Sequence, residues 1–135
     1  MKEINLNIKL DSPVYKNKEQ TPEEIKNKVP IEKVEIPAYE IAVRWIQQAL
    51  ETAINDIDPQ TGRPRKAVKL EVHRRYNRVM NALEAHKEGI AQLEDDDYDF
   101  LNRKYHQAEM SVHREVSKVL DMISLAINQT NKVEE

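Results

Sequence analysis

Residues 38–57 read AYEIAVRWIQQALETAINDI and carry the strongest structural signal in the chain. Apolar side chains recur there at steps of three and four residues over almost five turns, which is the period of an amphipathic α-helix. The apolar face is wide enough for us to expect packing on two sides. Asp58-Pro59 ends the helix, and residues 58–66 are predicted to form a loop that contains glycine and proline.

Helical periodicity continues towards the C-terminus. Residues 68–83 place their apolar side chains on one face, and Gly89 is a natural C-terminal cap for that helix. Between residues 95 and 129 the apolar phase does not slip, so the pattern permits a single helix of about 35 residues. A break near Met110-Ser111 is equally allowed, because serine is a good N-cap. The sequence leaves one helix or two open.

The first 37 residues follow a different pattern. Alternation of apolar and polar side chains from Ile4 to Leu10 predicts a strand with one buried face. Thr21-Pro22 is typical of a helix start, and residues 29–36 form another extended piece. The predicted fold is therefore mainly α, a three- or four-helix bundle with a small N-terminal β-ribbon. We expect a single domain in which segment 1–37 packs on the bundle formed by residues 38–131.

Composition excludes several classes of function. The chain has 135 residues, a net charge of −3, no cysteine and only 2 glycines. Thiolate metal sites and a cysteine nucleophile are excluded, and there is no glycine-rich phosphate loop. No apolar run approaches the roughly 20 residues that span a bilayer, and residues 1–20 lack the apolar region of a signal peptide. We therefore expect a soluble intracellular protein that has no membrane partner and no cofactor.

Charge is segregated along the chain. Residues 63–78 contain seven basic side chains and a single acidic one, Glu71, so their net charge is +6. Residues 84–99 have a net charge of −6. Such a basic segment is typical of contacts with phosphates or with an acidic protein surface. A solvated face partly neutralised by the acidic segment is the favoured interpretation, ahead of an acidic protein surface and of nucleic acid. The predicted partner-binding residues are Arg63, Arg65, Lys66, Arg74, Arg75 and Arg78.

No group of residues indicates catalysis. His106, Glu109 and His113 have a spacing that could hold zinc on one helical face, but this face points towards water, so solvated histidines are the favoured interpretation. The acids at positions 94–99 lack the glycine of a calcium loop and fit the first turn of a helix. We expect no metal site, no catalytic residue and no enzyme activity.

One segment bears a family resemblance. Leu93-Glu94-Asp95-Asp96-Asp97-Tyr98-Asp99-Phe100-Leu101, followed by Lys104, resembles a segment of short proteins from tailed bacteriophages. The order of an extended N-terminus, an apolar helix, a glycine-containing loop and a basic helix is also similar. The resemblance implies a role in binding host machinery such as RNA polymerase, or in virion assembly, and it transfers no catalytic residue.

Together these observations predict a non-enzymatic, phage-encoded factor that occupies a surface of a larger host protein complex in the bacterial cytoplasm. The alternative is a virion or assembly component whose N-terminal ribbon adds strands to a neighbour. A nucleic-acid-binding accessory role through residues 63–78 is the third option. The partner and the oligomeric state stay open at this stage.

Overall fold

The computed structural model describes residues 1–56, 58, 60, 61, 63, 67–110 and 113–128, and the backbone alone of 131–132. The predicted fold class is confirmed: the chain is mainly α, with a small N-terminal ribbon. Within the described part, no helix is long and apolar enough to cross a membrane. The helices are α1 (Pro22–Lys26), α2 (Ala38–Ile54), α3 (Leu70–Glu84), α4 (Asp95–Gln107) and α5 (Arg114–Asn128).

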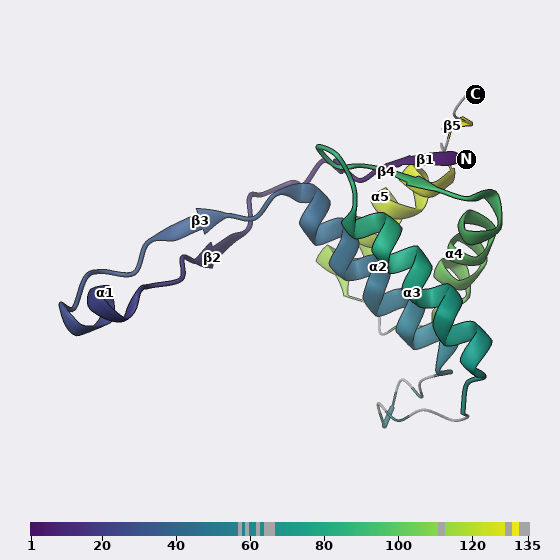
Figure 1. Ribbon diagram of the computed structural model, residues 1–135, viewed down its shortest axis with the longest axis horizontal. Coiled ribbons are helices and arrows are strands. Elements are labelled where there is room, and N and C mark those ends of the chain that lie inside the picture. Colours follow the sequence, from purple (N-terminus) through teal and green to yellow (C-terminus); the bar gives the residue numbers. More distant parts are fainter. Residues whose placement is uncertain are drawn as a thin grey trace.

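Helix α2 lies at the centre of the body and contacts α3, α4 and α5 (Figure 1). The side chains buried along this helix pack against more than one neighbouring helix, in agreement with the predicted packing on two sides. Ile46 and Leu50 are fully buried among residues that include Leu83 of α3, Leu101 of α4 and Ile123 of α5. The helix ends at Ile54, because Asn55 caps it and Asp56 adopts a left-handed backbone conformation with φ of 48°.

A three-stranded sheet closes one end of the body, in the order β4 (Ile90–Leu93), β1 (Lys2–Asn5), β5 (Asn131–Lys132). Strand β1 is antiparallel to both neighbours, with Ile4 opposite Ala91. The alternation predicted for the N-terminus is observed, since Ile4, Leu6 and Ile8 are buried while the residues between them are exposed. Strand β4 is not part of the sequence prediction.

Gly89 makes the turn from α3 into β4 possible. Its φ of +83° favours glycine, and a Cβ there would lie 2.4 Å from Oδ1 of Asn7. Its N–H donates to Nδ1 of His86 at 3.0 Å, and its carbonyl accepts from the N–H of Leu6 at 2.7 Å. Gly89 therefore serves the junction with β1, while α3 itself already ends at Glu84 and is capped by Ala85.

The described residues between 95 and 128 form two helices, which decides the alternative that the periodicity left open. Helix α4 ends at Gln107 and α5 begins at Arg114, and Ser111, the predicted cap, lies outside the described residues. Two tyrosines of α4 join the pair: the hydroxyl of Tyr98 donates to the carbonyl of Ile127 at 2.8 Å, and that of Tyr105 to the carbonyl of Leu120 at 2.6 Å.

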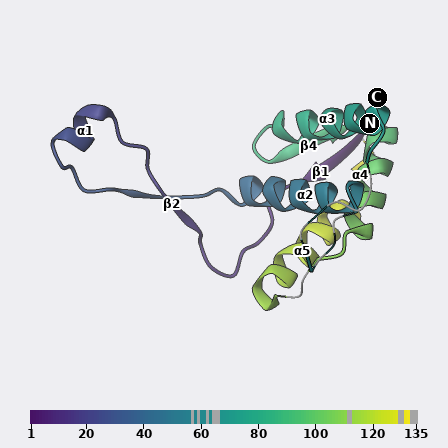
Figure 2. The ribbon, with the colours of Figure 1, turned by 90° about the horizontal axis from the view of Figure 1, so that it is seen from below.

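Segment 11–35 departs from the expectation that residues 1–37 pack on the bundle. Asp11 still pairs with Lys118 of α5 at 3.3 Å, but beyond Val14 the segment runs out from the body and returns as a long arm, which projects past the helices of the body in two perpendicular views (Figures 1 and 2). All its residues except Gln20 and Glu24 are exposed. The physical reason is composition: its few apolar side chains are separated by lysine, glutamate and proline, so the segment has no continuous face to bury against α2.

Candidate functional site

The shaft of the arm is a narrow antiparallel ribbon of β2 (Tyr15–Asn17) and β3 (Lys33–Glu35). Further backbone hydrogen bonds extend it at both ends, from the N–H of Ile36 to the carbonyl of Val14 and from the N–H of Lys18 to the carbonyl of Glu32, each at 2.7 Å. A two-stranded ribbon is at best marginally stable by itself. This ribbon has no layer packed on either face along 15–35.

The tip of the arm is a small, hydrogen-bonded knob built on α1. Thr21 caps the helix in a capping box with Glu24, and Pro22 occupies the first turn, as the sequence predicts. The side-chain amide of Gln20 donates to the carbonyl of Val29 at 2.7 Å, which closes the knob at its base. Polar contacts thus fix the backbone.

Apolar side chains project from this knob and contact no core. Ile25 is 63% exposed, Ile31 is 59% exposed and Val29 is 39% exposed. Isolated apolar residues on a protein surface are normal, but a group of them at the end of a projection is typical of an interaction site. We define these three residues as the tip cluster.

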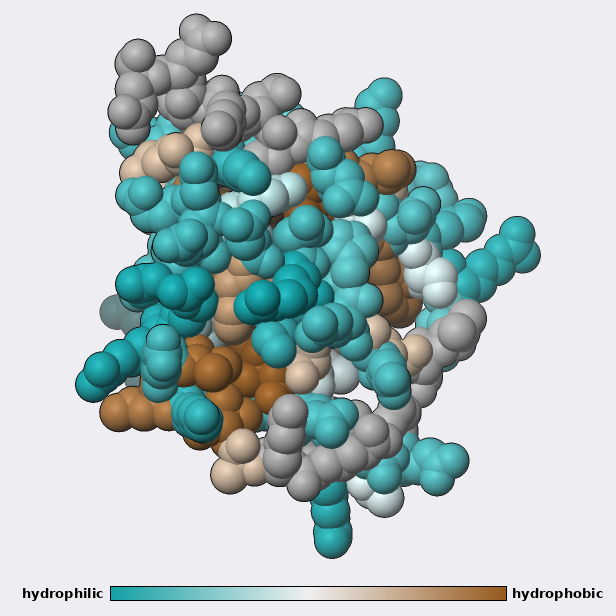
Figure 3. Space-filling view, turned by 90° about the vertical axis from the view of Figure 1, so that its right-hand side faces the viewer, coloured by the Kyte–Doolittle hydropathy of each residue, from teal (hydrophilic) through white to brown (hydrophobic). Residues whose placement is uncertain are grey.

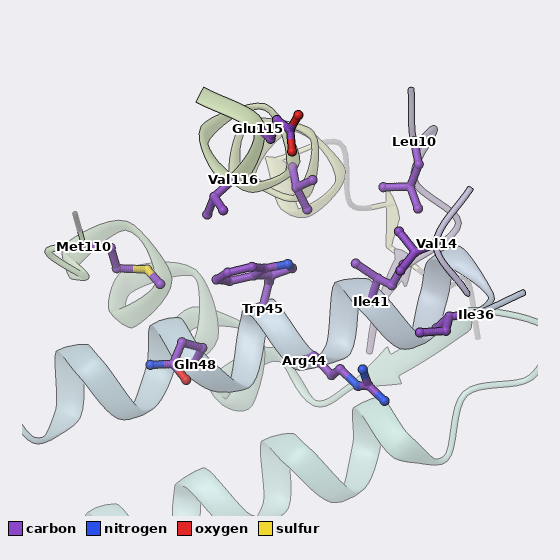
Figure 4. Close-up of a pocket in the computed structure, with 11 residues that line it drawn as sticks. Leu10, Val14, Ile36, Ile41, Arg44, Trp45, Gln48, Met110, Glu115 and Val116 are labelled. Atoms are coloured by element: carbon purple, nitrogen blue, oxygen red, sulfur yellow. The ribbon is translucent and has the colours of Figure 1, made fainter. Parts of the chain in front are cut away.

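A second apolar surface lies where the arm joins the body. An open groove of about 630 Å³ runs between α2 and α5, with the root of the arm at one end (Figure 4). Charged side chains of both signs stand at its edge, Arg44 from α2 and Glu115 from α5. The apolar side chains that line it come from three parts of the chain: Leu10, Val14, Ile36, Ile41, Trp45, Met110, Val116 and Val119.

Trp45 is the only tryptophan of the chain and lies in this groove. Its position on the apolar face of residues 38–57 predicts a side chain that fills the core. It is instead half-buried, with its ring between α2 and the side chain of Val116 (Figure 4). Periodicity assigned the correct face, but α5 leaves this part of the α2 surface uncovered.

Four of the predicted basic residues lie in the part of the chain that the structure describes, three on α3 and one in the loop before it. Arg74 is exposed and Arg75 half-buried on α3, while Arg63 is exposed in the preceding loop. Arg78 donates through Nη2 to Oδ1 of Asp97 at 2.8 Å, and this carboxylate is buried, so Arg78 joins α3 to the first turn of α4. Arg65 and Lys66 lie outside the described residues. Hydrophilic side chains cover most of the end of the body opposite to the arm (Figure 3).

The histidines are separated by the break between α4 and α5, so His106, Glu109 and His113 do not share one helical face. Among the described residues, no group of three metal-ligating side chains lies together. His106 instead bridges the helices, with Nδ1 2.7 Å from the carbonyl of Asn102 and Nε2 2.7 Å from the hydroxyl of Ser124. This serine–histidine contact lies in mid-helix on α5, where backbone N–H groups are committed to the helix and offer no oxyanion hole.

Two tyrosines have perturbed acidity for structural reasons. Burial raises the pKa of Tyr105, with a further contribution from the nearby carboxylate of Asp121. Burial and the carboxylate of Glu51 raise the pKa of Tyr76. The phenol of Tyr105, which donates to the carbonyl of Leu120, therefore stays protonated well above neutral pH.

Comparison with protein-family models, with curated proteins and with solved structures gives no match. The candidate site therefore rests on the geometry of the arm and the groove. Sequence reasoning missed both, although one signal was present: Ile25, Val29 and Ile31 stand as apolar residues inside an otherwise polar, lysine- and glutamate-rich segment.

Proposed function

We propose that this chain is a non-enzymatic structural component of a protein assembly, which binds a neighbouring protein through the arm. The observation that supports the proposal is the exposure of residues 11–35, apart from Gln20 and Glu24. Extending and ordering such a segment costs conformational entropy, roughly 1–2 kcal/mol per residue for the backbone. A partner that buries the apolar side chains of the arm offsets that cost.

The size of the arm agrees with this role. A standard protein–protein interface takes about 20 to 30 residues from each partner. The arm supplies a segment of that length as one continuous projection. The unpaired outer edges of β2 and β3 also allow a neighbour's strand to add to the ribbon. The resemblance to short tailed-phage proteins implies that such an assembly is a virion or an assembly intermediate within the bacterial host.

Amide hydrogen exchange tests the proposal. In the isolated chain, at a concentration at which it is monomeric, amides of residues 15–35 are expected to exchange quickly, because solvent reaches almost all of the ribbon. In the complex captured from phage-infected host lysate or from purified particles, the same amides are expected to become protected, whereas those of α3 stay as they were. Equal exchange of the arm in the free and the captured chain would show that the arm is not the binding element.

A second candidate function is occupation of a host protein complex, such as RNA polymerase, through Arg63, Arg74 and Arg75, which we call the basic face. One observation favours it: among the described residues, no ion pair engages Arg63, Arg74 or Arg75. Unpaired surface cations attract an acidic partner over a distance and speed its association. Nucleic acid is the third option and differs by an affinity that falls steeply with salt.

Reversal of two charges tests the basic face. The double variant Arg74→Glu/Arg75→Glu is expected to fold normally and, if this face binds the partner, to slow association about tenfold at low salt. The matched control is Lys9→Glu/Arg103→Glu, which makes the same charge change at two exposed positions elsewhere. Stopped-flow or surface-based kinetics with the captured partner measures the rate, and equal rates for the two variants would remove the basic face from consideration.

A further inference from the structure

We infer that the groove between α2 and α5 receives the arm tip of a second copy of this chain. This inference rests on the proposed role of the arm and names its partner. Among the described residues, apolar side chains are exposed both in the tip cluster of Ile25, Val29 and Ile31 and in the groove around Trp45. A contact between two copies buries both surfaces at once.

The tip cannot fill the groove of its own chain. Val14 and Ile36, which begin and end the ribbon, themselves line the groove. From there the ribbon leads away from the body, so that α1 lies at the far end of the molecule (Figures 1 and 2). The same geometry that keeps the tip from its own groove makes it available to a neighbour.

The tip is preorganised for binding. The capping box of Thr21 and Glu24 and the hydrogen bond from Gln20 to Val29 hold its backbone before any partner arrives. A binding element that is already ordered loses less conformational entropy on association than a flexible loop does. Aliphatic side chains on such a rigid knob are suited to a concave apolar surface.

The charges of the two surfaces are compatible with contact between copies. The tip carries Glu23 and Lys26 within one helical turn, and the groove has Arg44 and Glu115 at its edge. Each surface therefore presents both signs of charge, so the tip of one copy is not repelled by the groove of another. Since the contact is mainly apolar, its affinity is expected to change little with salt, unlike docking through the arginines of α3.

This pairing of surfaces indicates that the groove is filled by a second copy of the chain. The arm has the number of residues that one side of a standard interface requires, about 20 to 30, and the groove volume of about 630 Å³ has room for several side chains. Each copy offers one tip and one groove. The contact therefore closes into a dimer when two arms are exchanged, and into a ring or filament when it runs head to tail.

Sedimentation velocity of the full chain over a range up to about 100 μM tests the inference, because contacts of this size give dissociation constants from micromolar downwards. The wild-type chain is expected to form dimers or larger closed species. Ile25→Ser/Ile31→Ser is expected to weaken association at least about 30-fold, as for removal of interface residues that dominate binding. The control Leu70→Ser/Leu125→Ser changes two leucines that are 63% and 51% exposed on the body and should associate like the wild type.

Complementation identifies the groove as the receiving surface. Val116→Glu introduces a carboxylate into the groove and should abolish self-association, and Gln48→Arg, at an exposed groove position, serves if circular dichroism shows that the first variant is misfolded. Mixing the groove variant with Ile25→Ser/Ile31→Ser leaves one intact tip and one intact groove. A heterodimer of one copy of each variant is expected in that mixture only.

The outcomes separate the inference from the proposed function. A wild-type chain that stays monomeric over the whole range, or a mixture that yields no heterodimer, overturns the inference. The proposed role of the arm survives that result if the arm amides become protected in the captured complex. It fails independently if those amides stay unprotected there.

Discussion

Replacing residues 15–35 by Asn-Gly is expected to leave the body folded and to abolish its association with partners. Val14 and Ile36 are joined by a backbone hydrogen bond of 2.7 Å, which is the geometry that a two-residue turn connects. The excised residues contribute no side chain to the core. Among the described residues, the one ion pair they make with the body is that of Lys16 with Glu40, at 3.5 Å on the surface, and such pairs contribute about 0–1 kcal/mol.

The free energy of unfolding is therefore expected to change by less than about 1 kcal/mol. Association with partners is expected to be lost completely. Urea denaturation followed by far-ultraviolet circular dichroism measures the first quantity, and sedimentation velocity measures the second. The tip variant Ile25→Ser/Ile31→Ser provides the comparison. It should lose self-association to the same extent as the shortened chain. A shortened chain that fails to fold, or that still associates, would contradict the assignment of the arm as a binding element.

Ile46→Ala is expected to lower the free energy of unfolding by about 3 kcal/mol, within the range for loss of a large aliphatic side chain from a core. Ile46 is fully buried on α2, in the cluster that unites the central helix with α3, α4 and α5. The cavity left by the substitution is bounded by several helices at once, so the surroundings relax only partly.

A nearby exposed residue of the same helix provides the control for this prediction. Gln48→Ala is expected to change stability by no more than about 0.5 kcal/mol. Urea denaturation gives the free energy of unfolding of both variants. The two values are compared with the same dependence on urea concentration. A cost below about 1 kcal/mol for Ile46→Ala would mean that α2 is not the central helix of the core.

Local sequence patterns predicted the elements that are fixed by local physics. The three- and four-residue spacing of apolar side chains defined α2, and Thr21-Pro22 defined the start of α1. Strand β4 was not predicted, because four residues with two buried side chains carry too little periodicity to be read without their partner. Its pairing with β1 joins residues about 90 positions apart, and it depends on the turn at Gly89.

The candidate site was the least predictable part for the same reason. The groove draws Leu10, Trp45 and Val116 together from three distant segments, and no local pattern encodes that juxtaposition. The break between α4 and α5 was undecided, because the apolar phase is the same on both sides of it. Charge, a local property, did identify the basic segment, but only the fold reveals that Arg78 is engaged by the buried Asp97.

The fluorescence of Trp45 is the most direct measurement of the central claim, since this single tryptophan lies half-buried in the groove that a second copy is inferred to occupy. Its emission maximum should move to shorter wavelength as the concentration of the wild-type chain rises, because the arm tip of a neighbour removes water from the ring. The emission of Ile25→Ser/Ile31→Ser should stay constant over the same range. A wild-type emission maximum that does not depend on concentration, in a chain that nevertheless associates, would contradict docking of the tip in this groove.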